Sequence, residues 1–353
     1  MSCYSPLRAV VLGKNQETGK KIIKILKGSD FSYELEHPDF EYINIPCGHC
    51  IGCRLKYSRI WADRCMAEAS YYDNNIFLTL TYNDRYLPLP LENIDYDSGE
   101  YLGTFSPVHP LVKRDVQLFI KRLRKALPVQ EIRYFLCGEY GPSTMRPHYH
   151  LLLFNCRLDD LKLLYQNDSN FKYYTSDTIT KCWYVESAAD RVKSWYSGDR
   201  VISDFPSAGF HIITSVNWQT CAYVARYIVK KQFGEGAEIY KDFNFPPEFT
   251  LMSRKPGIGR QFYEDNKELL YHDEVYLSTE EGHRIIRPNK YYDSLYDIDY
   301  PDSMSCIRED RKRIAKVNES FKSNLTSLTF LDRLKSEELV QQDRLRSLHR
   351  KEL

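Results

Sequence analysis

Residues 146–154, Arg-Pro-His-Tyr-His-Leu-Leu-Leu-Phe, place two of the chain's nine histidines on either side of one tyrosine and then continue into an apolar run. The run predicts a β-strand over 147–154 that enters a hydrophobic core. Because side chains alternate along a strand, His148 and His150 point to the same face, where they can bind one ion. Two hydrogen-bonded histidines in a protein interior would give the same spacing, so the spacing alone supports both interpretations.

A second strand is predicted just before this one, over 131–139, and the loop between them contains Gly141, Pro142 and Ser143. Strands that follow each other closely are usually neighbours in a sheet, here antiparallel ones. The chain turns back after Glu139, so the pairing can bring this carboxylate beside the two histidines. Two imidazoles and one carboxylate with open positions suit a catalytic divalent cation, Mg²⁺ or Mn²⁺, rather than a closed structural zinc.

The hydrophobic pattern of the rest of the chain predicts the fold class. Strands are predicted at 75–83 and 210–216, and helices at 54–72, 115–127 and 217–231. From residue 75 onward the order of elements is strand, helix, strand, strand, helix, strand, helix. This order predicts an α+β protein with a central, mostly antiparallel sheet flanked by helices. The other segments are expected to be short strands or irregular at 1–45, helix and loop at 158–205, loop-rich at 236–300, and charged and helical after 305.

Composition limits the class of protein. With 353 residues, of which 42% are hydrophobic, the chain is long and apolar enough to bury a globular core. No apolar run approaches the roughly 18 residues that a membrane helix needs, and the N-terminus lacks a signal peptide's apolar stretch. We therefore expect a cytoplasmic protein with no membrane partner. The formal net charge of +1 gives the chain no global attraction to nucleic acid, so any such attraction has to be local.

One local concentration of positive charge coincides with the predicted helix at 115–127. Six basic residues stand there against one acid, Asp115, and they are Lys113, Arg114, Lys121, Arg122, Arg124 and Lys125. A run of this kind is also typical of a solvated helix face. We interpret the six side chains as candidates for binding DNA phosphates.

The predicted helix at 217–231, with Asn217 as its N-cap, separates aromatic from apolar positions. At about 100° per residue, one apolar stripe contains Trp218, Cys221, Ala222, Ala225, Ile228 and Val229. Tyr223, Tyr227, Lys230 and Lys231 lie off this stripe, and the two tyrosines stack four residues apart. A phenol becomes a nucleophile toward phosphorus once its proton is removed, which nearby lysines favour. In a chain with 28 tyrosines, two amphipathic surface tyrosines are the alternative.

The cysteines are clustered in a way that suggests a metal. Cys47, Cys50 and Cys53 are spaced three residues apart, and a cytoplasmic chain with ten cysteines favours metal binding over disulfides. Three thiolates need a fourth ligand, for which Cys3 is the first candidate and His49 or Cys65 the alternatives. The expected ion is a structural Zn²⁺, while an iron–sulfur cluster or free buried thiols would also account for the spacing.

Two of these motifs together resemble a known superfamily. The His148-Tyr149-His150 strand, followed by Tyr223, Tyr227 and two lysines, resembles the HUH endonucleases that initiate rolling-circle replication, in their two-tyrosine microvirus branch. Four further segments are similar to the gokushovirus group of that branch, and they are 47–54, 77–82, 138–141 and 253–259.

The resemblance implies an HUH/RRM-like fold and a mechanism. Glu139, His148 and His150 would hold Mg²⁺ or Mn²⁺ at the scissile phosphate of an origin. Tyr223 and Tyr227 would attack in turn, leaving a 5′-phosphotyrosine and a free 3′-OH. The resemblance gives Lys230 and Lys231 a role in positioning phosphate, and it places Thr79 and Thr81 near the DNA.

The resemblance also implies partners and a division of the chain. The partners would be single-stranded and replicative-form phage origin DNA with the host helicase and polymerase, in the host bacterial cytoplasm. The expected segments are a cysteine-rich region with a helix at 1–70, a nickase core at 71–235, a loop-rich extension at 236–300 and a helical tail at 301–353. Two other functions fit the residues: a non-catalytic, zinc-containing DNA-binding protein, and a metal-dependent phosphodiesterase that uses water.

Overall fold

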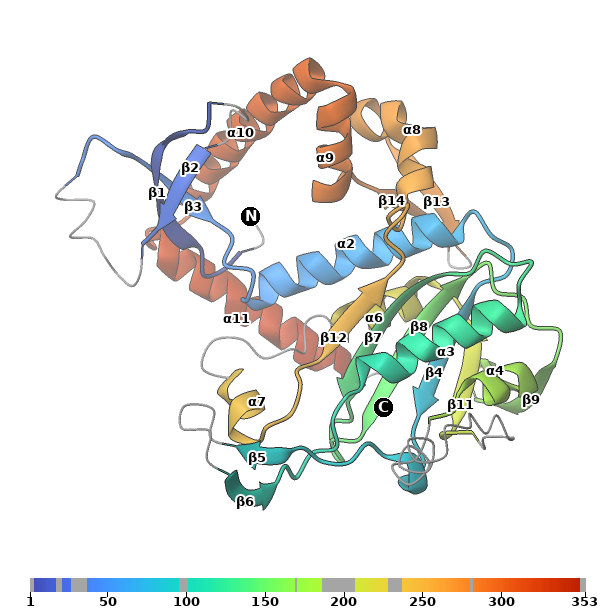
Figure 1. The fold of residues 1–353 in the computed structure, drawn as a ribbon. Helices are drawn as coiled ribbons and strands as arrows, with labels where there is room; N and C mark the ends of the chain where they lie inside the picture. Colours follow the sequence, from blue (N-terminus) through green and yellow to red (C-terminus); the bar gives the residue numbers. More distant parts are fainter. Residues whose placement is uncertain are drawn as a thin grey trace. The chain divides into compact units, whose positions relative to one another are not determined.

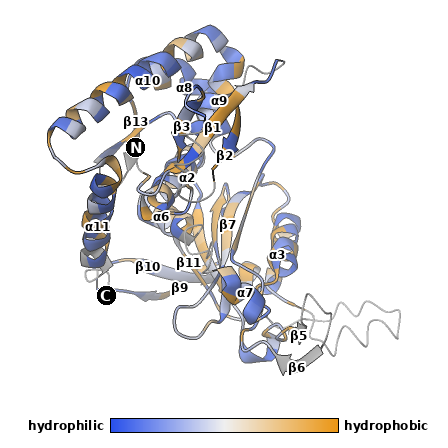
Figure 2. Ribbon diagram, turned by 90° about the vertical axis from the view of Figure 1, so that its left-hand side faces the viewer, coloured by the Kyte–Doolittle hydropathy of each residue, from blue (hydrophilic) through white to orange (hydrophobic). Residues whose placement is uncertain are grey.

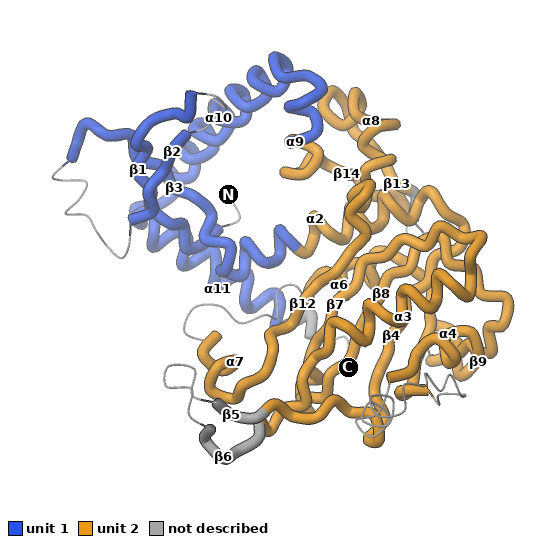
Figure 3. Tube along the Cα trace, viewed as in Figure 1, with its two compact units in different colours: residues 1–57, 294–353 blue, residues 58–293 orange. Residues whose placement is uncertain are grey.

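The structure, a computed structural model, describes residues 3–16, 21–26, 37–94, 101–168, 170–185, 207–227, 237–279 and 282–349. The chain forms two compact units (Figure 3). One comprises residues 1–57 and 294–353, and the other comprises residues 58–293. Compactness defines these units, so the functional boundaries at residues 70, 235 and 300 stay a prediction.

A seven-stranded sheet is the centre of the 58–293 unit (Figure 1). Each pair of neighbouring strands in it is antiparallel. Its order is β12 (Phe249–Met252), β7 (Arg133–Tyr140), β8 (Pro147–Phe154), β4 (Ile76–Thr81), β11 (His211–Ser215), β10 (Lys172–Ser176) and β9 (Leu161–Gln166). The predicted fold class, α+β with a central antiparallel sheet flanked by helices, is confirmed.

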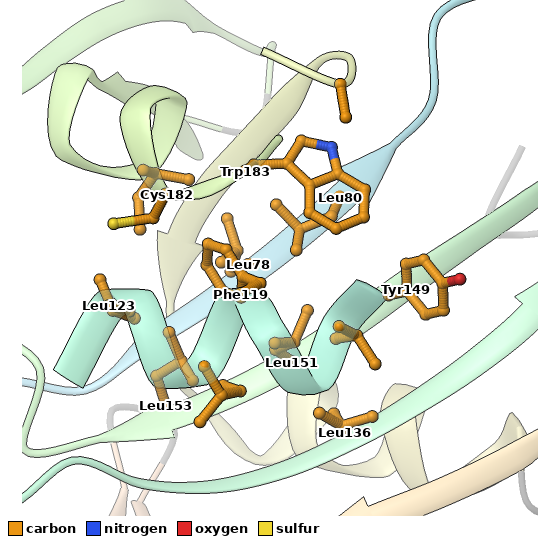
Figure 4. Packing of buried hydrophobic residues seen from close by; sticks show 14 of the residues in the cluster. Leu78, Leu80, Phe119, Leu123, Leu136, Tyr149, Leu151, Leu153, Cys182 and Trp183 are labelled. Atoms are coloured by element: carbon orange, nitrogen blue, oxygen red, sulfur yellow. The ribbon is translucent and has the colours of Figure 1, made fainter. Parts of the chain in front are cut away.

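One face of the sheet is covered by α3 (Lys113–Ala126) and α4 (Asp177–Cys182). Alternation along β8 sends Tyr149, Leu151 and Leu153 to this side, where they are fully buried (Figure 4). They join one cluster with Phe119 of α3 and Trp183, which follows α4. Each such side chain contributes about 1.5–3 kcal/mol by leaving water, so this face supplies much of the unit's stability.

The opposite face is covered by α2 (Ile51–Ala69) and α6 (Trp218–Tyr227). Leu152 and Phe154 of β8 pack there in one cluster with Ala62 of α2 and Ala225 of α6. The small residues on both helices let them lie close to the sheet. His148 and His150 have the same parity as Leu152 along β8, so they point to this face.

The start of α6 agrees with the sequence prediction. Asn217 precedes the helix, and its Oδ1 accepts a 2.8 Å hydrogen bond from the Thr220 backbone N–H, as an N-cap residue does. The helix is described as far as Tyr227, whereas its expected continuation to Lys231 lies outside the described residues.

Two expectations about the rest of the unit were wrong. The segment 158–205, expected to be helix and loop, contributes strands β9 and β10 before α4; its residues 186–206 lie outside the described part. All six side chains of β9 are exposed, so the strand carries no inside–outside alternation that a sequence could reveal. The segment 236–300, expected to be loop-rich, contains α7 (Ile239–Asp242), β12, α8 (Arg260–His272), β13 (Val275–Thr279), β14 (Gly282–Ile286) and α9 (Lys290–Asp299).

Three short elements complete this unit. They are the 3₁₀ helix η1 (Asp84–Tyr86) and the paired strands β5 (Glu92–Ile94) and β6 (Tyr101–Phe105). Strands β13 and β14 form a further antiparallel pair.

The other unit has a sheet of order β2 (Lys21–Ile25), β1 (Leu7–Lys14) and β3 (Glu41–Ile45). It also contains α10 (Pro301–Asn324) and α11 (Phe330–His349), which confirm the expected C-terminal helices. Figure 2 shows both helices mostly hydrophilic, in contrast to the largely hydrophobic β7. Among the described helices of the chain, none is long and apolar enough to cross a membrane.

Candidate active site

Three ionisable side chains meet on the face of the large sheet that carries α6. The register of β7 and β8 sets Glu139 opposite His148 and Cys137 opposite His150, which brings the three side chains to one face. The two histidine Nε2 atoms lie 2.6 Å and 2.9 Å from the same atom, Oε1 of Glu139. The predicted antiparallel pairing and the predicted position of Glu139 therefore agree with this geometry.

The outer nitrogen of each imidazole also has a partner. His148 Nδ1 lies 3.1 Å from the backbone oxygen of Arg146, which can only accept, so Nδ1 carries a proton. In a neutral His148, Nε2 then presents a lone pair to the carboxylate oxygen. Two lone pairs at 2.6 Å repel each other, so either a second proton on His148 or a cation between the groups stabilises the arrangement.

The carboxylate of Glu139 is anionic at neutral pH. Burial would raise its pKa, but the hydrogen bonds and charges of His148 and His150 outweigh burial and lower the pKa to about 2. Glu139 is only 1% exposed, so it is held as an anion where few water molecules can solvate it. A buried anion that faces two nitrogen atoms is an environment that binds cations.

The three residues fit a small divalent cation. Their ligand atoms all lie within 4.8 Å of one another. Neighbouring ligands around an octahedral ion with bonds of about 2.1 Å are about 3.0 Å apart, close to the two nitrogen–oxygen separations. The side chain of His148 is 18% exposed, so one side of the group remains accessible to a phosphate oxygen or water. Three protein ligands with an open side are typical of a catalytic rather than a structural site.

Thr79 of β4 supports His150 from the neighbouring strand. The register pairs Thr79 with His150, and its Oγ1 lies 2.9 Å from His150 Nδ1. A hydroxyl can accept the Nδ1 proton, which leaves Nε2 free for a cation. The sequence prediction gave Thr79 a place near DNA and missed this contact, since only the register of β4 against β8 reveals it. Thr81 donates instead to the backbone oxygen of Phe210, at 3.0 Å.

Tyr223 of α6 lies beside this group. Its ring centroid is 5.2 Å from that of His150, with the two planes at 86°, and 6.1 Å from that of Phe77. The ring is 39% exposed although Cys221, Ala222, Val224 and Ala225 around it are buried. This agrees with the prediction that Tyr223 lies off the apolar stripe. The side chain of Tyr227 lies outside the described part of the chain, as do Lys230 and Lys231.

The basic run lies on the other face of the sheet. Helix α3 packs through Val116, Phe119 and Leu123 against the cluster that contains Tyr149 and Leu151, opposite the histidines. Two of its cations serve packing. Arg122 bonds the Tyr184 backbone oxygen at 2.6 Å, and Arg124 bonds the Ile132 oxygen at 2.7 Å. Lys113, Arg114, Lys121 and Lys125 are exposed, and DNA binding by the run stays a prediction.

A second group with metal-ligand spacing belongs to the other unit. The Sγ atoms of Cys3, Cys47, Cys50 and Cys53 lie within 4.8 Å of one another. Cys65, an alternative fourth ligand in the sequence prediction, is buried in the cluster under α2 and is not part of the group. Burial opposes ionisation of Cys50, but backbone N–H donors at Tyr4, Cys53 and Ser5 lower its pKa to about 7.

The fold and the site define an α+β protein with a candidate metal-dependent centre, and comparison with known proteins identifies its family. The family model of the replication-associated protein ORF2 matches residues 75–232, which include Glu139, both histidines and both tyrosines. Comparison with solved structures gives no significant match.

Three phage proteins are similar to this chain. The replication-associated protein ORF2 of Spiroplasma virus 4 is 30% identical over 345 residues, 96% of this chain and 94% of that protein. The replication-associated protein VP4 of Bdellovibrio phage phiMH2K is 30% identical over 319 residues, 86% of this chain and 79% of that protein. The replication-associated protein ORF4 of Chlamydia phage 1 is 30% identical over 153 residues, 40% of this chain and 33% of that protein. The chain belongs to this family of phage replication-associated proteins.

Proposed function

We propose that this protein initiates rolling-circle replication of a single-stranded DNA phage by nicking and rejoining origin DNA through a tyrosine nucleophile. The observation that carries the proposal is the contact between the Tyr223 ring and His150, one member of a converging Glu-His-His group. A protein that only bound DNA would need no such group. Membership of a family of phage replication-associated proteins supports the same interpretation.

The proposed reaction exchanges one phosphodiester for another. The phenolic oxygen of Tyr223 or Tyr227 attacks the scissile phosphorus, a bond from tyrosine oxygen to phosphorus forms, and the bond from phosphorus to the 3′ oxygen breaks. The phenolic proton is lost and the leaving oxygen gains one, which produces a free 3′-OH and a 5′-phosphotyrosine. Rejoining is the reverse attack by a 3′-OH. Because the phosphotyrosyl bond keeps the energy of the original ester, no ATP is needed.

The side chains of the site have separate roles in this reaction. Glu139, His148 and His150 would hold Mg²⁺ or Mn²⁺, which supplies positive charge that polarises a phosphoryl oxygen. Tyr223 lies next to this group, and its partly exposed ring is accessible to a DNA strand. Lys230 and Lys231, the lysines after the helix, are proposed to position the phosphate and to favour the phenolate.

The proposed partners follow from the products. A free 3′-OH is a primer that the host polymerase can extend, and strand displacement ahead of it requires the host helicase. Thr81 and the exposed lysines of α3 are candidates for further DNA contacts, on opposite faces of the sheet. The expected site of action is the cytoplasm of the bacterial host.

Trapping of a covalent protein–DNA band tests the proposal. Labelled single-stranded oligonucleotides tiled across the phage genome are incubated with the protein and Mn²⁺, then separated under denaturing conditions. We expect one or a few oligonucleotides to give a band that EDTA prevents. Tyr223→Phe and Tyr227→Phe together should abolish the band, whereas Tyr276→Phe, a control on β13, should leave it unchanged.

The other outcomes distinguish the alternative functions. Cleavage that survives loss of both tyrosines would indicate a phosphodiesterase that uses water. Binding without cleavage by any oligonucleotide would indicate a non-catalytic DNA-binding protein. Either result would overturn the proposed mechanism.

A further inference from the structure

We propose that Cys3, Cys47, Cys50 and Cys53 bind one structural Zn²⁺ that fastens the start of the chain to the beginning of α2. The group shares no residue with the candidate active site, and the nicking proposal does not use it. Its argument rests on the spacing of the sulfur atoms, on their hydrogen bonds and on the elements that they join.

The spacing of the sulfur atoms fits a tetrahedral ion. The Cys3 Sγ lies 3.7 Å from the Cys47 Sγ and 3.9 Å from the Cys50 Sγ. Four thiolates around Zn²⁺ with bonds of about 2.3 Å form a tetrahedron with edges of about 3.8 Å. A disulfide would require about 2.05 Å, so the pairs are too far apart to be oxidised as they stand.

Backbone N–H groups point at these sulfur atoms, as expected for thiolates. Cys3 Sγ accepts from the Cys47 N–H at 3.3 Å, and Cys50 Sγ accepts from the Tyr4 N–H at 3.2 Å. Cys47 Sγ accepts from the N–H groups of His49 and Cys50, at 3.4 Å and 3.2 Å. These donors stabilise negative charge on sulfur, which is the form that binds metal.

The turn that makes the last two bonds depends on one glycine. Gly48 follows Cys47 with φ of 81°, a left-handed conformation that a side chain disfavours. This conformation folds the next two N–H groups back toward the Cys47 sulfur. The order Cys-Gly-x-Cys therefore encodes both the ligand pair and the turn between its members.

The four ligands come from three places that the fold brings together. Strands β1 and β3 pair so that Leu7 is opposite Ile45, so Cys3 and Cys47 leave the same end of this strand pair. Cys50 immediately precedes α2 and its backbone oxygen accepts from the Arg54 N–H at 3.1 Å, while Cys53 lies in the first turn. The positive end of the helix dipole also favours thiolates there.

Zinc fits this set better than a cluster of irons. The four sulfur atoms surround one point, whereas the thiolates of an iron–sulfur cluster bind different irons and spread farther apart. Four thiolates complete the coordination shell of Zn²⁺ and leave no open position, which is typical of a structural site. A single iron in the same tetrahedron is the remaining alternative, and the metal content decides it.

Metal analysis of the full-length protein, purified aerobically without added metal, tests the proposal. We expect about one zinc per chain, colourless protein, and release of the zinc by a thiol-reactive mercurial. Each of the variants Cys3→Ser, Cys47→Ser, Cys50→Ser and Cys53→Ser should lose most of it. Cys306→Ser, at an exposed cysteine outside the group, should keep it.

Two further measurements keep the test independent of folding and of the active site. Replacement of the metal by Co²⁺ in the unaltered protein should give the intense sulfur-to-cobalt absorption of a tetrahedral four-thiolate site. The His148→Ala/His150→Ala variant should keep its zinc, which excludes the active-site group as the source. Iron in place of zinc, absence of metal, or a Cys3→Ser variant that keeps stoichiometric zinc would each overturn the proposal.

Discussion

Two histidines on one strand bind different kinds of partner through their outer nitrogens. His148 meets the backbone oxygen of Arg146, and His150 meets the hydroxyl of Thr79. The Arg146 side chain is itself held by Asp84 at 2.7 Å and by the Tyr82 backbone oxygen at 3.0 Å. These contacts orient both rings toward Glu139, so the convergence of the three groups depends on residues that ligate nothing.

Thr79 allows this positioning to be tested. Thr79→Val keeps the shape of the side chain but leaves His150 Nδ1 without its hydroxyl partner, so we expect Mn²⁺ to bind about 10- to 100-fold more weakly. The measurement is the Mn²⁺ concentration that gives half-maximal covalent adduct, supported by direct titration. Thr79→Ser should retain the affinity, and Thr81→Val, whose hydroxyl bonds a backbone oxygen, should change it little. An unchanged Mn²⁺ requirement in Thr79→Val would show that the hydroxyl does not position His150.

His211 of β11 makes stability depend on pH. Its Nε2 accepts a 3.0 Å hydrogen bond from the Ser176 N–H, and burial lowers its pKa, although Asp160 opposes the shift. The unfolded chain therefore binds the proton more readily, so this stability is present above about pH 6.5 and is lost as pH falls below it.

The size of the His211 effect can be measured by chemical denaturation. Between pH 7 and 5.5 the free energy of unfolding should fall by up to about 1.4 kcal/mol per pH unit from this group alone. His211→Gln should show a shallower dependence than the unaltered protein, and His283→Gln, at an exposed histidine, should match the unaltered protein. Equal slopes for His211→Gln and the unaltered protein would contradict the prediction.

At the scale of elements, helix α6 links packing to the site. Its buried side holds Ala222 and Ala225 against the sheet, and its other side presents Tyr223 to His150. The N-cap fixes where the helix begins, and therefore which residues fall on each side. A shift of one residue would rotate Tyr223 by about 100°, away from the histidine.

Asn217→Ala removes this cap. We expect a loss of about 0.5–2 kcal/mol in the free energy of unfolding, because the N–H of Thr220 loses its side-chain acceptor. Asn217→Asp keeps an acceptor oxygen and should lose much less. Denaturant titration of the three proteins checks the order, and a stability of Asn217→Ala equal to that of Asn217→Asp would argue against the cap.

The elements that could be predicted are those whose burial leaves a periodic pattern. Strands β4, β7 and β8 carry dense apolar residues, and α3 repeats them at helical spacing, so all four were predicted. Strand β9 has six exposed side chains and no such pattern. Helix α8 buries Phe262, Tyr263 and Leu270, a helical signal that the nearby proline and glycine residues obscured.

The candidate site divides in the same way. Glu139 could be placed beside the histidines because a short loop fixes the pairing of two consecutive strands. Thr79 could not, because its strand is distant in sequence and its register is set by packing across the whole sheet. The same limit applies to the choice of Cys3 over Cys65, since residue 3 reaches the cysteine cluster only through the pairing of β1 and β3.

At the scale of the whole molecule, the proposed metal ions belong to different compact units. The Glu-His-His group lies within residues 58–293, and the four cysteines lie within the unit of residues 1–57 and 294–353. The first group sits on a sheet that is packed on both faces, whereas the cysteines close the end of a small sheet of three strands. The small sheet should therefore depend on its metal far more than the large one does.

Amide hydrogen exchange, followed by mass spectrometry, can measure this difference. Release of zinc with a mercurial should speed exchange in peptides from β1, β3 and the start of α2, because the zinc no longer joins them. Peptides from β4 and β8 should keep their protection, since their hydrogen bonds are covered by packed helices. EDTA at a concentration that removes Mn²⁺ but not zinc serves as the control and should leave β1 unchanged. If β8 loses protection as much as β1, the zinc supports the whole molecule rather than one unit.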